Sequence, residues 1–184
     1  MDGGVITYIH KDISKFKPIK NLTFCNSYNH CLATEIQVGS KKITILNIYR
    51  SPDYLNTSFL EEFEKVVDQC KNRTCYILGD SNYNLLNLDK HQPTETYFNL
   101  LTAASFKPLI TKPTRITDTS QSLIDHVWTN DLRNNNTTKS HIIITDITDH
   151  FPCITTVSSP EINMKGYRTI LKRDFNEKAK DVFS

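Results

Sequence analysis

Four apolar, strand-like runs of this 184-residue chain each end in a cluster of polar side chains. The clusters are Asn47-Ile48-Tyr49-Arg50, Gly79-Asp80-Ser81-Asn82, Ser122-Leu123-Ile124-Asp125-His126 and Thr148-Asp149-His150-Phe151. One polar strand end is unremarkable, but active sites are commonly built from loops and strand ends on a rigid sheet. We therefore expect the four clusters to converge, with Asp125 and His150 in hydrogen-bond contact.

The apolar runs predict a chain in which strands outnumber helices. Cys31–Val38 and Ile43–Tyr49 are joined by Gly39-Ser40-Lys41-Lys42, which predicts a β-hairpin. Cys75–Leu78 is wholly apolar and predicts a buried strand that ends at Asp80. Further strands are expected at Gly3–Ile9, Leu123–Thr129, His141–Ile147 and Pro152–Val157, with Asn134-Asn135-Asn136 as a turn.

Two amphipathic segments predict helices between these strands. Ser58–Cys70 begins with a Ser58 and Glu61 capping pair and places Leu60, Phe63, Val66, Val67 and Cys70 on one face. Thr94–Ala104 predicts a second helix, with Phe98, Leu101 and Ala104 facing inward. Hairpins with helices inserted between them favour an α/β sandwich of packed mixed sheets over a doubly wound parallel sheet.

The polar residues suit the hydrolysis of a phosphodiester bond. That reaction needs a positioned water and cationic stabilisation of the phosphate oxygens. Aspartates such as Asp80 can hold Mg²⁺, which prefers oxygen ligands. A histidine bonded to an aspartate has a fixed tautomer and raised basicity. Asn82 supplies an amide, and Tyr49 and Arg50 supply donors for a phosphate.

Each of these residues also has a structural interpretation when it is taken singly. Asp80 suits a turn, Asp125 with His126 suits a surface pair, and His150 suits a strand cap. Only the joint occurrence of the four clusters favours the catalytic interpretation.

Composition excludes several other classes of protein. Apolar residues make up 38% of the chain, which is enough for the core of one domain, and the net charge of +2 neither requires nor excludes nucleic acid. The five cysteines include no Cys-x-x-Cys pair, so a zinc site or a disulfide framework is not expected. The sequence shows no signal peptide and no apolar run near the ~20 residues of a membrane span.

The four clusters, in this order, resemble the endonuclease/exonuclease/phosphatase superfamily, which includes DNase I and the apurinic/apyrimidinic endonucleases. Three further segments are similar to the endonuclease of jockey-like non-LTR retrotransposons: Gly-Gly-Val-Ile-Thr-Tyr-Ile at 3–9, Lys-Pro-Thr-Arg-Ile-Thr at 112–117 and Ile-Asp-His-Val-Trp-Thr-Asn at 124–130. The resemblance implies a four-layer α/β sandwich of the DNase I-like type and a metal-dependent endonuclease that nicks target DNA.

The resemblance also implies a role for each catalytic candidate. Asp80 would position or activate the attacking water, with Asn82 beside it. His150 would contact the scissile phosphate or transfer a proton, and Asp125 would orient its ring. Tyr49 would donate to the phosphate.

A metal and a DNA surface follow from the same resemblance. Asp149 would lie at the metal centre, which would hold Mg²⁺ or Mn²⁺. The residues expected to contact DNA are Arg50, Thr114, Arg115 and Ser122.

The sequence departs from the family pattern at the N-terminus. Family members begin with a strand that carries an asparagine, and a glutamate that is the main metal ligand follows further on. Both come before the strand that matches residues 3–9. We therefore expect an incomplete domain at 1–158, weak metal binding and poor activity on its own. Residues 159–184 resemble a linker toward a reverse transcriptase that is absent here.

Two other functions stay open at this point. One is a catalytically dead remnant or binding module of the same fold, and the other is a superfamily phosphatase, which the segments at 112–117 and 124–130 disfavour. Nicking of chromosomal DNA would require the nucleus, and no membrane partner is expected.

Overall fold

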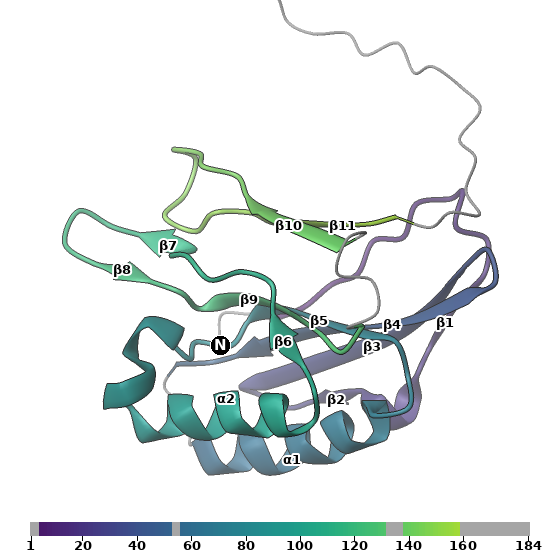
Figure 1. Ribbon diagram of the computed structural model, residues 1–184, viewed down its shortest axis with the longest axis horizontal. Coiled ribbons are helices and arrows are strands. Elements are labelled where there is room, and N and C mark those ends of the chain that lie inside the picture. The colour runs from purple at the N-terminus through teal and green to yellow at the C-terminus, as the bar shows by residue number, and fades with distance from the viewer. Residues whose placement is uncertain (1–3, 53–55, 132–137, 159–184) are drawn as a thin grey trace, which may run out of the picture.

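The computed structural model describes residues 4–52, 56–131 and 138–158, which build a mixed sheet with helices on one face and a strand pair over the other (Figure 1). The main sheet has the order β1-β3-β4-β5-β9-β6, and β2 pairs with β3. Its strands are β1 (Phe16–Pro18), β2 (Phe24–Cys25), β3 (Asn29–Val38), β4 (Lys41–Arg50), β5 (Cys75–Asp80), β6 (Lys107–Pro108) and β9 (Asp125–Thr129). The remaining strands form two pairs, β7 (Arg115–Ile116) with β8 (Gln121–Ser122) and β10 (Thr138–Ile142) with β11 (Cys153–Val157).

The predicted hairpin is confirmed as β3 and β4, which pair in register from Asn29 with Arg50 to Val38 with Lys41. The chain then passes through helix α1 (Asn56–Cys70) and returns as β5, parallel to β4. A parallel pair needs such a crossover. Strand β9 runs antiparallel to β5, so the centre of the sheet is mixed, as the sequence predicts.

Helices α1 and α2 (Gln92–Ala103) cover one face of the sheet (Figure 1). Their buried residues, including Phe59, Phe63 and Leu101, pack against Leu46 and Ile77 of the strands. The predicted inward residues Phe98, Leu101 and Ala104 pack on the core, and Tyr97, which the prediction did not include, is buried there as well. The physical reason is ring stacking, since the Tyr97 ring lies 4.7 Å from the ring of Tyr83.

The opposite face of the sheet carries the β10–β11 pair (Figure 1). A smaller core of Ile110, Leu123 and Val127 lies there, with Ile142 of β10 and Cys153 of β11 packed against it. The fold class of the prediction is confirmed as mixed α/β. In the described part of the chain, the second sheet of the expected sandwich consists of β10 and β11, and the α-helices cover one face only.

Two predicted strands differ from the structure. Residues 4–10 form no β-ladder with any described residue, and Ile6 and Tyr8 are 69% and 85% exposed, because no neighbouring strand covers them there. Strand β10 ends at Ile142 instead of Ile147. The predicted turn at 134–136 and the predicted linker at 159–184 lie outside the described residues. No helix among the described residues is long and apolar enough to cross a membrane.

Candidate functional site

Three candidate catalytic side chains lie in a row across the centre of the sheet. Tyr49 at the end of β4 is opposite Asp80 of β5, and Asp80 is opposite Asp125 of β9. Residues directly opposite one another in a sheet point to the same face. This is the face that carries β10 and β11, because Tyr76 of β5, which shares the face with Asp80, contacts Thr138 of β10 through its hydroxyl.

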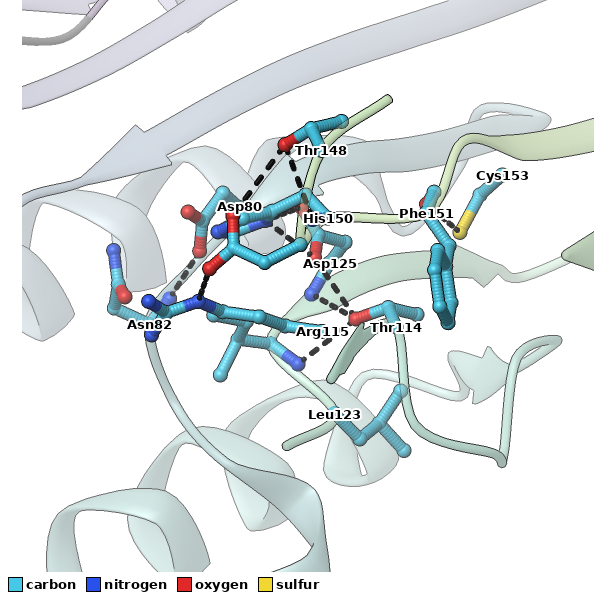
Figure 2. A network of polar contacts seen from close by, with 12 residues as sticks. Asp80, Asn82, Thr114, Arg115, Leu123, Asp125, Thr148, His150, Phe151 and Cys153 are labelled. Atoms are coloured by element: carbon cyan, nitrogen blue, oxygen red, sulfur yellow. Dashed lines mark hydrogen bonds and ion pairs between the residues drawn. The ribbon is translucent and has the colours of Figure 1, made fainter. Parts of the chain in front are cut away.

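His150 completes the row from the loop before β11 (Figure 2). Its Nδ1 lies 3.2 Å and 3.1 Å from Oδ1 and Oδ2 of Asp125, so the predicted contact between these residues is confirmed. When Nδ1–H donates to the carboxylate, Nε2 becomes the nitrogen that can face a ligand. The loop is held in place because the Phe151 N–H donates to the Thr114 carbonyl at 2.7 Å.

Thr114 lies behind Asp125. Its hydroxyl donates to Oδ2 of Asp125 at 2.8 Å and accepts the N–H groups of Ile124 and Asp125 at 3.3 Å and 3.0 Å (Figure 2). The residue has no exposed surface in the structure, and its predicted contact with DNA stays a prediction. The three hydrogen bonds place the Asp125 carboxylate, and through it the ring of His150.

Asp80 occupies a partly desolvated position in this row. The pKa of Asp80 is raised to about 6, mainly by burial and in smaller part by the nearby Asp125 carboxylate, while the hydrogen bond from the N–H of Asn82 opposes the rise. That N–H donates to Oδ1 of Asp80 at 2.9 Å. A carboxyl with a pKa near neutrality is well matched to accept a proton from water.

Gly79 allows β5 to approach β4 closely just before Asp80. Its φ is +132°, and a Cβ at this position would lie 2.0 Å from the carbonyl oxygen of Ile48. A side chain would therefore collide with the backbone of β4, so the glycine is required where the carboxylate is delivered.

Arg50 contacts the backbone that follows Asp80. The residue is 3% exposed, its Nε donates to the Ser81 carbonyl at 2.7 Å, and its Nη2 donates to the Asn82 carbonyl at 3.0 Å. Its guanidinium also lies 4.2 Å from the centre of the Tyr83 ring. These contacts of Arg50 hold the backbone after Asp80, and its predicted contact with DNA stays a prediction.

Asn82 follows Asp80 in a left-handed conformation, with a φ of 52°. Its Nδ2 donates to the Arg50 carbonyl at 2.8 Å. Asparagine adopts this conformation more readily than most residues. The predicted place of Asn82 beside Asp80 is therefore confirmed, and its role toward a substrate stays a prediction.

Arg115 and Asp149 form an ion pair at the rim of the site. Arg115 Nε donates to Oδ2 of Asp149 at 2.7 Å, and both side chains are partly exposed. The hydrogen bond from Arg115 lowers the pKa of Asp149. Ser122 lies opposite Arg115 in the β7–β8 pair. The roles predicted for Arg115 and Ser122 at DNA, and for Asp149 at a metal, stay predictions.

The donor atoms that converge in the described part of the chain belong to Asp80, Asp125 and His150, all within 4.8 Å of one another. Two carboxylates at this spacing repel each other, and a cation would relieve that repulsion. Carboxylate oxygens suit Mg²⁺ or Mn²⁺, and Mg²⁺ is commonly bound by one or two of them with waters and substrate oxygens. The side chains present therefore fit a divalent metal ion, with Asp80 and Asp125 as its ligands.

A buried polar cluster was missed from the sequence. His126, which the sequence suggested as half of a surface pair with Asp125, is 2% exposed and points to the helix face. Its Nδ1 lies 3.0 Å from the hydroxyl of Ser81 and 3.3 Å from that of Tyr97. The available signal was the alternation of side chains along β9, which separates His126 from Asp125.

Neither a protein-family model nor a curated protein matches the chain. Solved structures do resemble it. The endonuclease domain of TRAS1, a telomere-specific non-LTR retrotransposon, superposes with a TM-score of 0.65 at 16% identity, covering 80% of this chain and 70% of that domain.

Two other structures resemble the chain less closely. An endonuclease/exonuclease/phosphatase family protein from Leptotrichia buccalis C-1013-b gives a TM-score of 0.52 at 14% identity over 79% of this chain and 61% of its own length. D. rerio TDP2, complexed with a single strand DNA product, gives 0.54 at 11% identity over 79% and 67%. These likenesses show that the chain has a DNase I-like fold.

Proposed function

We propose that this chain is a metal-dependent phosphodiesterase that cleaves DNA. The proposal rests mainly on the contact between Asp125 and His150, with Asp80 close to both on one face of a DNase I-like sheet. An imidazole whose Nδ1 is held by a carboxylate can present Nε2 to a phosphate. A second carboxylate with a raised pKa can accept a proton from water.

The side chains would divide the work as follows. Asp80 orients the attacking water and accepts its proton. His150, whose Nδ1–H is held by Asp125, donates from Nε2 to the phosphate or to the leaving oxygen when its ring carries a second proton. Tyr49, opposite Asp80, lies on the same face and donates to a phosphate oxygen. A Mg²⁺ or Mn²⁺ ion held by Asp80 and Asp125 would supply positive charge to the phosphate oxygens.

The finer form of the proposal is an endonuclease that nicks target DNA for a jockey-like non-LTR retrotransposon. The segments at 112–117 and 124–130 support it, as does the likeness to the TRAS1 endonuclease domain. We propose residues 1–158 as the nuclease domain and 159–184 as a linker. We propose the nucleus as the compartment where the activity would be used.

Nicking of supercoiled plasmid by the full chain, with Mg²⁺ or Mn²⁺ at several concentrations, tests this function. Metal binding by two carboxylates is expected to be weak, so nicking should be slow and should rise with metal concentration. His150→Ala should slow it by about 100-fold or more. The matched control is His141→Ala, because His141 is an exposed histidine of β10 outside the site.

The result that would refute the proposal is nicking that His150→Ala leaves unchanged, which would point to a contaminating nuclease. Tight DNA binding without nicking would favour the non-catalytic binding module. Release of inorganic phosphate from a monoester, with no nicking, would favour the phosphatase.

A further inference from the structure

His126 lies on the face of the sheet opposite to the one that carries Asp80 and Asp125. Its Nε2 lies 3.0 Å from the carbonyl oxygen of Leu123, and its Nδ1 lies 3.0 Å from the hydroxyl of Ser81. A carbonyl can only accept, so Nε2 carries the proton and Nδ1 accepts from the Ser81 hydroxyl. Both ring nitrogens of one buried imidazole are therefore engaged.

The hydrogen bond to Ser81 joins the two chain segments that carry the catalytic carboxylates, and the hydrogen bond to Leu123 fixes the ring within the segment of Asp125. Ser81 lies between Asp80 and Asn82, and Leu123 and His126 lie on either side of Asp125. The backbone reinforces the link, because the Ser81 N–H donates to the Ile124 carbonyl at 3.1 Å. A shift of either segment would disturb the spacing of the Asp80 and Asp125 carboxylates.

The surroundings of His126 leave its ring little freedom. The ring stacks on Tyr97 with 5.6 Å between ring centres and meets Trp128 edge-on at 6.2 Å. Burial keeps the imidazole neutral, because it lowers the pKa of His126 to about 4. The Ser81 hydroxyl is fixed as well, since it accepts the N–H of Tyr83 at 3.2 Å.

We propose that His126 is a positioning residue, which holds Asp80 at its working distance from the Asp125–His150 pair by tying Ser81 to Leu123. The inference rests on the proposed function, because a positioning role has meaning only for a site that performs chemistry. Misplacement of a reacting group by about 1 Å can cost on the order of 100-fold in rate. His126 therefore acts on the reaction without touching the substrate.

The test compares His126→Phe with His126→Gln in the full chain. Phenylalanine keeps an aromatic ring and removes the hydrogen bonds to Leu123 and Ser81 together with the 3.3 Å contact to the Tyr97 hydroxyl, whereas the glutamine amide can donate to Leu123 and accept from Ser81. We expect kcat for plasmid nicking to fall by about 10- to 100-fold in His126→Phe with little change in KM, and to recover substantially in His126→Gln. Ser81→Ala removes one of the same bonds, so its effect should not add to that of His126→Phe.

A second readout does not depend on activity. In ¹⁵N-histidine-labelled protein, His126 should show the Nε2–H tautomer, and the His150 ring signals should move in His126→Phe and return in His126→Gln. If no variant nicks DNA, the proposed function fails, and these signals still show whether His126 fixes the geometry around His150. Full nicking by a folded His126→Phe, no recovery in His126→Gln, or unmoved His150 signals would each overturn the inference.

Discussion

Replacing Thr114 with valine should lower both the stability of the fold and the rate of DNA nicking. Valine has nearly the same shape as threonine, so the change removes the hydroxyl without opening a cavity. The hydroxyl donates to Oδ2 of Asp125 and accepts two backbone N–H groups, those of Ile124 and Asp125. Since Thr114 has no exposed surface, no water can replace the hydroxyl without rearrangement.

The size of the effect follows from the three lost contacts. A hydrogen bond to a charged group contributes about 1.5–3 kcal/mol, and a buried donor left without an acceptor costs about 1–3 kcal/mol. These contributions share one oxygen and are not additive, so we expect the free energy of unfolding to fall by about 2–4 kcal/mol. A domain stabilised by about 5–15 kcal/mol would stay folded.

The catalytic effect should exceed what stability explains. Loss of a side chain that orients a functional group commonly costs about 10- to 100-fold in activity, and Thr114 orients Asp125, which orients His150. Urea unfolding measures the stability change, and plasmid nicking well below the unfolding transition measures the rate. Thr114→Ser is the matched control, because serine retains the hydroxyl.

Equal rates for Thr114→Val, Thr114→Ser and the parent chain would show that the hydroxyl does not position Asp125. A DNA-binding defect in Thr114→Val without loss of stability would support the DNA contact that the sequence predicted.

Three further predictions concern other parts of the site. Gly79→Ala should destabilise the fold by about 3 kcal/mol or more in thermal or urea unfolding, because its Cβ would meet the Ile48 carbonyl, whereas Gly4→Ala, with open space around it, should change nothing. Arg115→Ala should weaken DNA binding and reduce the salt slope by about 1, and an unchanged slope would return Arg115 to a solvated surface. Acidification from pH 6.5 to 4 should cost stability through His126, because in that window the unfolded chain takes up a proton that the buried ring refuses. This loss of unfolding free energy is at most about 3 kcal/mol. Protonation of Asp80 in the folded state opposes the loss, so it should be measured by urea unfolding in an Asp80→Asn background. His126→Gln in that background should abolish the loss.

The sequence predicted the elements that carry the site because their hydrophobic pattern is local. The hairpin of β3 and β4 follows from its alternation and its glycine turn, and β5 follows from an apolar run that ends in Gly79-Asp80. Residues 4–10 were misassigned because a strand-like sequence forms a strand only where a partner pairs with it. The described residues provide none.

The burial of Arg50 and Thr114 could not be predicted from residue type alone. Arginine and threonine beside a catalytic cluster suit a phosphate equally well, and burial depends on which neighbours arrive from distant parts of the chain. Arg50 meets Tyr83 and the carbonyls of Ser81 and Asn82, which follow it by 31 residues or more. Thr114 meets Asp125 only because the loop at 112–114 folds back beneath β9.

Strand alternation nevertheless contained part of the missing information. In β4, Arg50 shares a face with the buried Leu46 and Ile48, so its side chain had to point toward the helices when Tyr49 pointed away from them.

The same alternation separates Asp80 from Ser81 and Asp125 from His126. Ser81 and His126 face the helices, while Asp80 and Asp125 face β10 and β11. Each motif on the central strands thus consists of one residue for the candidate site and a neighbour that fixes it from behind. Arg50, Ser81 and His126 are joined by hydrogen bonds on that rear face, through the Ser81 carbonyl and the Ser81 hydroxyl. A substitution on the rear face should therefore act on Asp80 and Asp125 together.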